Sequence, residues 1–304
     1  MNTSPTITRA ALASLTLLAL GACDFQKIGN QATAKTVAVS TLLTTPVIEV
    51  KGAAIASNGF DASIPDFDGG LLLDAGVLFA DAGITIPAQN LAFVFFGQRQ
   101  GTNLDAAPVG TPGATAKLKQ VGGSTFTLDD VGGGAYSLSP DAGFTYAPNA
   151  TYQFEFTLQS QVFLAEVTDV PAQENIPQFH PAAGFVDLNA GDAFAFTRPD
   201  PPQGQNRNFG FVNVFPVNAQ GQQGQPTYTN IPTTALGFLK LVVAPTDWTV
   251  TNVEIPGSAF PDKDANYIVV LQSAKLGGPK SDNLFTGSAI LAGTADVAIV
   301  KTRK

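Results

Sequence analysis

The sequence predicts an all-β fold, and three observations lead to that prediction. Segments in which apolar and polar residues alternate recur along the chain, and a period of two is typical of strands with one face in the core and one in water. Glycine, proline, asparagine and aspartate separate these segments, as at the turns of sandwich folds. The 304 residues are 44% hydrophobic and 13% charged. The chain therefore has enough apolar side chains for a substantial core without disulfides.

The first 22 residues have the pattern of a secretory signal. Arg9 precedes an uncharged, mostly apolar run from residue 10 to residue 22. This run is shorter than the ~20 apolar residues that a transmembrane helix needs. A basic start, a short apolar stretch and small residues at its end are typical of a signal peptide. We therefore predict that residues 1–22 are removed from the mature protein.

The end of this run explains the position of the single cysteine of the chain. Leu20-Gly21-Ala22-Cys23 resembles the lipobox of bacterial lipoproteins at all four positions. The resemblance implies that the sulfur of Cys23 carries a diacylglycerol, that the chain is cut just before it, and that the new N-terminus is acylated. One acyl chain anchors only marginally, so two or three are needed for stable attachment. The resemblance implies a membrane-anchored protein of the cell envelope, facing the periplasm or the cell exterior, with residues 23–35 as a short polar tether.

Two domains are expected after the tether, because the length of the chain suits about two domains of ~150 residues each. Residues 171–183 combine prolines with polar side chains and lie between two strand-rich regions. We predict that they link a first β-sandwich domain at 36–170 to a second at 184–304.

The clearest predicted strand lies at 151–158, where apolar and polar residues alternate without exception. A turn at Ser160–Gln161 and a return strand at 162–170 complete a hairpin. Near the end of the chain, a strand at 267–274 is separated by a predicted loop at 275–283 from strand segments at 284–293 and 295–300, which together give a second hairpin. The core-facing residues of the first strand are Tyr152, Phe154, Phe156 and Leu158. Further strands are predicted at 37–41, 46–50, 84–87, 91–97, 124–128, 192–197, 209–217, 239–243 and 248–255.

Two tyrosines begin strands after proline-containing turns. They are Tyr152 in APNATYQFEF and Tyr267 in FPDKDANYIVVLQ. This pattern resembles the entry to strand F of immunoglobulin-like and fibronectin type III domains, where the tyrosine hydroxyl bonds back to the backbone at a corner. The resemblance implies two immunoglobulin-like antiparallel β-sandwiches in which Tyr152 and Tyr267 have structural roles.

The sequence offers no catalytic constellation. His180 is the single histidine, so a Ser-His-Asp triad would have to use it. It lies in the predicted linker, and the chain has no Gly-x-Ser-x-Gly elbow. We therefore predict that the protein is not an enzyme and has no catalytic residues.

One acidic loop leaves a metal site open. Asp262, Asp264 and Asn266 place oxygen ligands at alternate positions, as calcium loops do. The loop lacks the glycine at the sixth position, and Ser273 stands where the twelfth-position glutamate would be. Aspartate and asparagine also favour turns by bonding their own backbone, which is the other interpretation. A weaker acidic pair lies at Asp66 and Asp68, and no other cofactor is predicted.

Charge and composition leave two classes of function. The formal net charge of −8 argues against nucleic acid, which requires basic patches, and against electrostatic docking on anionic lipid. The first hypothesis is a non-catalytic envelope lipoprotein with a binding or scaffold role, whose partner is an envelope protein or a glycan. The alternative is a lipid-anchored carbohydrate-binding or carbohydrate-active protein, which would need exposed aromatic residues such as Tyr136, Tyr228 and Trp248 beside paired carboxylates.

Overall fold

A computed structural model describes most of the chain after residue 24. The described residues are 25–45, 47–50, 61–62, 75–76, 84–86, 88–101, 107–218, 224–231, 241 and 244–303. The predicted signal peptide, Cys23, Asp66, Asp68 and most of the strand predicted at 239–243 lie outside these ranges.

The described chain is all-β apart from one short helix and four 3₁₀ turns. Helix α2 (Phe25–Thr33) lies within the residues predicted as a tether. No helix in the described ranges is both long and apolar enough to cross a membrane. The 3₁₀ turns are η1 (Pro140–Ala142), η2 (Pro177–Phe179), η3 (Pro245–Trp248) and η4 (Gly257–Ala259).

Most strands belong to one 13-stranded sheet, in which the path of pairing runs β13-β19-β1-β6-β10-β9-β8-β11-β12-β18-β15-β16. Strand β7 pairs with β6 beside this path, and β18 also pairs with β19. Three two-stranded ribbons, β14–β17, β2–β5 and β3–β4, complete the described strands. The bounds are β1 (Thr36–Thr45), β2 (Ile48–Val50), β3 (Asp61–Ala62), β4 (Ala75–Gly76), β5 (Ile84–Ile86), β6 (Gln89–Gln98), β7 (Val109–Gly110), β8 (Thr115–Gln120), β9 (Thr125–Gly132), β10 (Ala135–Ser137), β11 (Tyr152–Leu158), β12 (Gln161–Val167), β13 (Val186–Asn189), β14 (Phe194–Thr197), β15 (Phe209–Val217), β16 (Tyr228–Thr229), β17 (Asn252–Ile255), β18 (Asn266–Pro279) and β19 (Ala289–Arg303).

The large sheet is mixed, which corrects the expectation of purely antiparallel sheets. Both β1 and β13 run parallel to β19. Strand β19 is 15 residues long, so each of its halves has backbone groups that need a partner. Strand β1 pairs along the first half of β19 and β13 along the second. The sheet thus continues across the predicted domain boundary, and an arrangement of two immunoglobulin-like sandwiches is not confirmed.

The predicted hairpin at 151–170 is present as β11 and β12, with every residue of β11 paired. Its turn lies one residue earlier than predicted, at Gln159 and Ser160. Both residues have positive φ, 47° and 69°. Two residues of positive φ match the right-handed twist of the flanking strands in a two-residue hairpin turn. Tyr152, Phe154 and Phe156 are fully buried, as the alternation predicts.

The loop predicted at 275–283 is wrong over its first five residues, because β18 continues to Pro279. This part of β18 pairs with β19 and then reaches β12. A Cβ atom on Gly277 would lie 2.2 Å from the carbonyl oxygen of Glu166. The glycines that resembled a loop signal in the sequence therefore allow a close approach between two strands.

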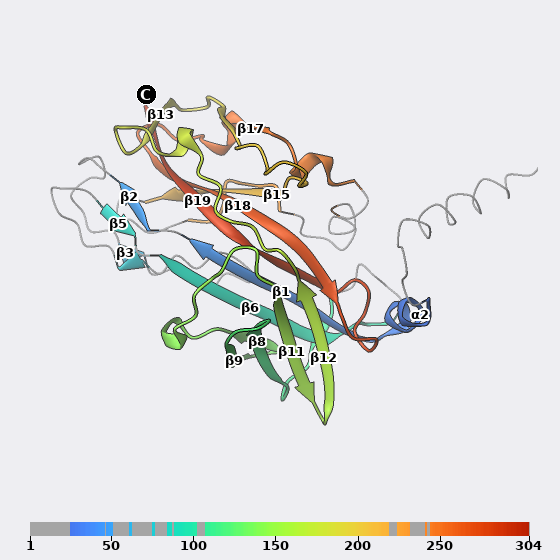
Figure 1. The fold of residues 1–304 in the computed structure, drawn as a ribbon. Helices are drawn as coiled ribbons and strands as arrows, with labels where there is room; N and C mark the ends of the chain where they lie inside the picture. The colour runs from blue at the N-terminus through green and yellow to red at the C-terminus, as the bar shows by residue number, and fades with distance from the viewer. Residues whose placement is uncertain are drawn as a thin grey trace, which may run out of the picture.

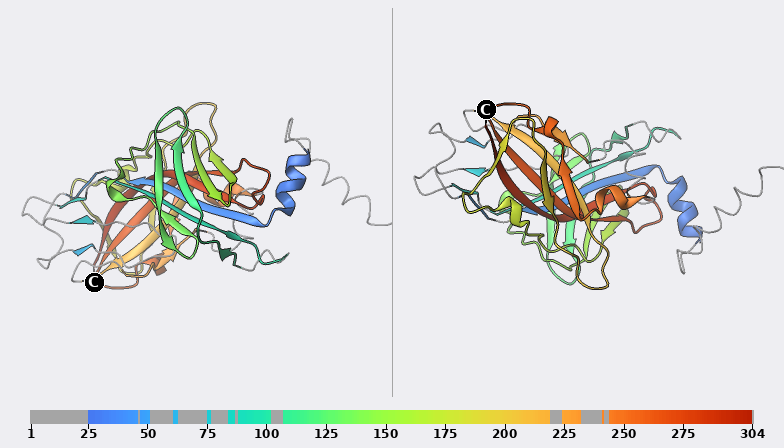
Figure 2. Two further views of the ribbon diagram at one scale, coloured as in Figure 1. Left: turned by 90° about the horizontal axis from the view of Figure 1, so that it is seen from below. Right: turned by 90° about the horizontal axis from the view of Figure 1, so that it is seen from above.

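Two large hydrophobic cores, and a smaller cluster of Phe211, Leu241 and Ala274, lie along the long strands in the described part of the chain. The first core gathers side chains from β1, β6 and β8–β12, and the second gathers side chains from β14, β15, β17, β18 and η2. One face of β19 contributes to both: Ile290 and Ala292 lie in the first core, and Ala298 and Val300 lie in the second. Figure 1 shows β8, β9, β11 and β12 on one side of the long strands and β13 and β17 on the other. Figure 2 shows α2 and the C-terminus at opposite ends of the molecule.

Candidate functional site

A strip of polar side chains separates the two cores on the shared face of β19. Thr294 and Asp296 lie between the two core-facing pairs of this strand, and both are buried. Buried Ser273 of β18 lies directly opposite Thr294. Buried polar groups cost free energy unless they are hydrogen-bonded. We call Ser273, Thr294 and Asp296 the polar strip.

The predicted linker, residues 171–183, provides hydrogen-bond partners for the polar strip. The Thr294 hydroxyl donates to the carbonyl oxygen of Ala172 at 3.3 Å. The Asp296 carboxylate accepts from the backbone N–H of Ile176 at 2.8 Å and from that of Val297 at 2.9 Å. The linker is thus bound across the sheet rather than held only at its ends.

His180 also contacts the polar strip. Its Nε2 atom lies 2.8 Å from Oδ1 of Asp296. The Asp296 side chain is 1% exposed, whereas the His180 side chain is 44% exposed. Burial raises the pKa of the Asp296 carboxyl group, although the N–H of Ile176 and the imidazole partly oppose this shift. A buried carboxylate that orients a half-exposed imidazole is two-thirds of a hydrolase triad. Within the described ranges, however, His180 has no hydrogen bond to a serine or threonine hydroxyl. Its contact with Asp296 joins the linker to β19.

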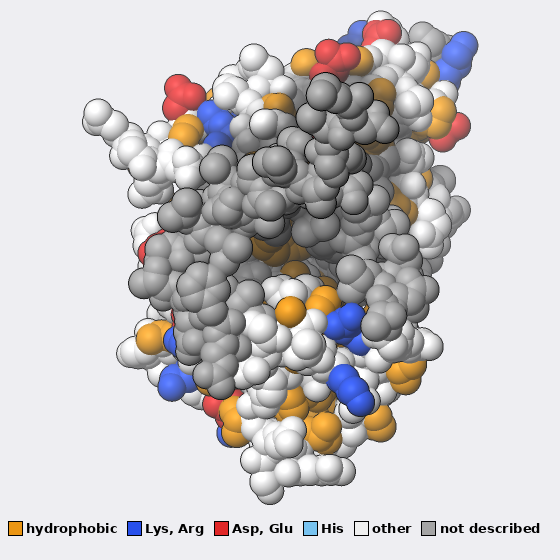
Figure 3. Space-filling view, turned by 90° about the vertical axis from the view of Figure 1, so that its right-hand side faces the viewer, with side chains coloured by type: hydrophobic (Ala, Val, Ile, Leu, Met, Phe, Trp, Pro, Cys, Tyr) orange, Lys and Arg blue, Asp and Glu red, His pale blue; other side chains and the backbone are white. Residues whose placement is uncertain are grey.

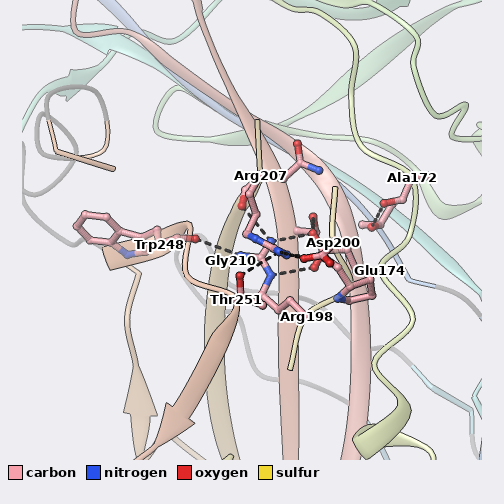
Figure 4. A network of polar contacts seen from close by, with 12 residues as sticks. Ala172, Glu174, Arg198, Asp200, Arg207, Gly210, Trp248 and Thr251 are labelled. Atoms are coloured by element: carbon pink, nitrogen blue, oxygen red, sulfur yellow. Dashed lines mark hydrogen bonds and ion pairs between the residues drawn. The ribbon is translucent and has the colours of Figure 1, made fainter. Parts of the chain in front are cut away.

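The strongest polar contact of the site is a buried ion pair, shown in Figure 4. Nε and Nη2 of Arg198 donate to the two carboxylate oxygens of Glu174 at 2.8 and 2.7 Å. The Arg198 side chain is fully buried, and that of Glu174 is 14% exposed. The hydroxyl of Ser273 donates to the same carboxylate at 2.7 Å. Glu174 therefore connects the linker to both the polar strip and Arg198.

The remaining donors of Arg198 are directed at backbone oxygens. Nη1 donates to the carbonyl oxygen of Trp248 at 3.2 Å, and Nη2 donates to that of Asn208 at 2.9 Å. Gly210 lies directly against the guanidinium group, and a Cβ atom there would be 2.6 Å from Nη1. The site holds three loops around one charged side chain, with no space left beside Gly210.

Arg207 extends this network toward the surface (Figure 4). Its guanidinium donates to the carboxylate of Asp200 at 3.2 Å and to the hydroxyl of Thr251 at 3.1 Å. The Asp200 side chain is 91% exposed. An ion pair with one fully solvated partner contributes little to stability, so Arg207 mainly organises the loop that precedes β15.

The two predicted structural tyrosines occupy equivalent corners in the two halves of the chain. The hydroxyl of Tyr152 accepts from the backbone N–H of Ala147 at 2.8 Å. The hydroxyl of Tyr267 accepts from the backbone N–H of Asp262 at 2.9 Å. Each bond spans five residues and closes the turn before a strand, and both tyrosines are fully buried.

The acidic loop that the sequence left open as a calcium site is held by hydrogen bonds within the protein. The Asp262 carboxylate accepts from the Tyr267 hydroxyl at 3.3 Å, and the carbonyl oxygen of Asp262 accepts from Thr302 at 2.7 Å. Asp264 adopts positive φ, 51°, which suits its role in a turn. Among the described residues, no three His, Cys, Asp or Glu side chains gather closely enough to hold a metal ion. Asn266 begins β18 and pairs with Lys301 of β19.

The aromatic residues considered for sugar binding pack against the body of the protein to different degrees. Tyr136 is buried in the first core. Tyr228 packs against the second core. Trp248 packs against the cluster of Phe211, Leu241 and Ala274 and donates from Nε1 to the carbonyl oxygen of Asn230 at 2.8 Å. Each ring is engaged at least partly with the body of the protein.

Glu174, Arg198 and Asp296 were not predicted from the sequence. One signal was available for Asp296, because it is the single carboxylate in the apolar run from residue 289 to residue 300. A lone acid at a core-facing position of a buried strand requires a partner. Comparison of the sequence with protein-family models and with curated proteins finds no match.

Proposed function

We propose that this chain is a lipid-anchored cell-envelope protein with a non-catalytic binding or structural role. The observation that carries the proposal is the four-residue motif ending at Cys23, which follows a signal-like apolar run. The location we propose is the surface of an envelope membrane, with the body facing the periplasm or the cell exterior. The proposed partner is an envelope protein or a glycan.

The non-catalytic part of the proposal is supported by how the buried polar groups are used. The oxygens of Glu174 accept from Arg198 and Ser273, and those of Asp296 accept from backbone N–H groups and His180. A general base must reach the proton that it abstracts from a substrate. These carboxylates instead face groups of the protein itself, which suits a structural role. No specific contact among the described residues favours the carbohydrate-active alternative.

We also propose that the two cores correspond to two immunoglobulin-like units that share strand β19. The equivalent corners at Tyr152 and Tyr267 support this proposal, as does the position of the linker between Val170 of the first core and Ile176 of the second.

The anchor is tested by the intact mass and the membrane fractionation of the natively expressed protein, beside its Cys23→Ser variant. We expect a membrane-bound product that begins at Cys23 and carries acyl mass, and a variant that lacks this mass. A wild-type product that is soluble and unacylated would overturn the proposal. If the product is membrane-bound and acylated, cross-linking in intact envelopes is the next step to find the partner.

A further inference from the structure

Helix α2 is fixed to the folded body. The Gln31 side chain is buried and donates from Nε2 to the carbonyl oxygens of Pro279 and Ser281, at 3.3 and 3.1 Å. The carbonyl oxygen of Gln31 accepts from the backbone N–H of Thr286 at 3.0 Å. These contacts bind α2 to the connection between β18 and β19.

The chain that follows α2 is bound to the same connection. The backbone N–H of Phe285 donates to the carbonyl oxygen of Thr36 at 2.7 Å. The guanidinium of Arg99 lies 3.8 Å from the centre of the Phe285 ring and donates to the carbonyl oxygen of Ala34 at 3.4 Å. We call residues 25–36, Arg99 and residues 280–288 the anchor end.

The length of chain before α2 limits how far the anchor end can lie from a lipid on Cys23. Helix α2 begins at Phe25, so Asp24 alone separates it from Cys23. Consecutive Cα atoms are about 3.8 Å apart, so the Cα atoms of Cys23 and Phe25 are separated by at most about 8 Å. An extended tether of residues 23–35 would instead reach about 45 Å. Folding and docking of α2 remove most of that reach.

We propose that the anchor end is a membrane-contacting surface that holds the protein in one orientation against phospholipid headgroups. This proposal rests on the proposed lipidation of Cys23. The orientation follows from the short connection, not from net charge. Lys35, an exposed basic side chain on this end, is suited to headgroup phosphates, whereas the ammonium of Lys280 pairs with the carboxylate of Glu166. In Figure 3, which faces this end, Lys and Arg side chains lie among hydrophobic ones in the lower part of the view.

This orientation directs the other end of the molecule away from the membrane. Strand β19 starts beside the anchor end and runs for 15 residues, which is about 50 Å at ~3.3 Å per residue. Its last residues pair with β13 near the C-terminus. The loops around β13 would therefore face a partner across the envelope space.

The test compares two labelled positions in the full, lipidated protein. A cysteine replaces Thr286 at the anchor end or Asp192 beside β13, and both positions are exposed. The sulfur of Cys23 is acylated, so an environment-sensitive dye reacts with the introduced thiol. The vesicles contain phosphatidylethanolamine, phosphatidylglycerol and a lipid with a nitroxide on its headgroup. We expect the dye at position 286 to lose most of its fluorescence and the dye at position 192 to lose almost none.

The outcomes separate the orientation from the anchor. A protein that fails to co-float with the vesicles overturns the anchor and the orientation together. A protein that co-floats with equal quenching at both positions overturns the orientation alone. A flexible Gly-Ser insertion between Asp24 and Phe25 should preserve flotation and reduce quenching at position 286. If quenching at position 286 is unchanged by the insertion, the short connection does not set the orientation.

Discussion

Glu174 and Arg198 form a two-point ion pair between the predicted linker and the strand-rich region that follows it, with N···O distances of 2.8 and 2.7 Å. The Arg198 side chain is fully buried. Such a pair stabilises the fold little more than apolar residues would at both positions. Removing one partner alone is costly, because the other charge is then buried without a counter-ion. Its position makes it the main polar link between the linker and the second core.

Replacing Glu174 with glutamine should be strongly destabilising. The variant keeps the shape of the side chain but leaves the Arg198 charge without a counter-ion, and this loss is typically about 3–5 kcal/mol. Urea unfolding followed by circular dichroism measures the change. The matched control is Glu155→Gln, since the Glu155–Lys117 pair is at least one-third exposed on both sides. Exposed pairs are worth about 1 kcal/mol or less, so equal losses at the two positions would contradict this account.

Gly210→Ala tests how tightly the ion pair is enclosed. The new methyl group would lie 2.6 Å from Nη1 and 2.9 Å from Cζ of Arg198, and overpacking of this kind costs about 1–3 kcal/mol. Gly29→Ala is the control, because nothing lies within 4 Å of its Cβ position in helix α2. Alanine there should stabilise the helix by about 0.5–1 kcal/mol. Thermal unfolding midpoints that move in opposite directions are the expected result.

Local patterns in the sequence predict where strands lie better than they predict which strands pair. Alternation at 151–158 is sufficient to predict β11 and its buried face, because a half-buried strand has a period of two. The pairing of β1 with β19 joins residues about 250 positions apart. No local pattern encodes such a pairing, since it depends on which strand edges remain unpaired after the hairpins form.

Only those parts of the candidate site that a short sequence motif encodes were predicted. The corners at Tyr152 and Tyr267 follow from a proline-containing turn and a strand start, both of which are visible in the sequence. The ion pair brings together Glu174 and Arg198 through the packing of three separate loops around Gly210. Proline and polar residues at 171–183 resemble a free linker, because the polar strip that binds them lies more than 90 residues away in the sequence.

Tyr152→Phe and Tyr267→Phe should each lower the free energy of unfolding by about 1–3 kcal/mol. Each variant leaves a part-buried backbone N–H, that of Ala147 or of Asp262, without its acceptor, and a donor left unpaired away from water has a cost of up to this size. Tyr228→Phe is the control, because the described residues give its hydroxyl no hydrogen-bond partner. If all three variants lose the same stability, the corner bonds are not the cause. The measurement is urea unfolding of the three variants beside the wild type.

The buried carboxylate of Asp296 should make the protein less stable as the pH rises. Burial raises its pKa in the folded state, despite the opposing N–H of Ile176 and the imidazole of His180. Below the ordinary aspartate pKa of about 3.9, the carboxyl is protonated in both states. Above it, the unfolded chain releases its proton first, so the free energy of unfolding falls until the pH passes the folded-state pKa. The stability difference between the wild type and Asp296→Asn should therefore decrease with pH over this window.

Glu166 provides a control of opposite sign for that experiment. Burial alone would raise its pKa, but hydrogen bonds from Gln153 and Lys280 and the charge of Lys280 outweigh burial and lower the pKa. Its stabilising contribution is complete above the ordinary glutamate pKa of about 4.3 and is lost as the pH falls through the folded-state pKa. The difference between the wild type and Glu166→Gln should increase with pH. Both slopes are measured by urea unfolding at closely spaced pH values. A His180→Asn background removes the titration of the imidazole. Slopes of the same sign would contradict the assigned directions of the two pKa shifts.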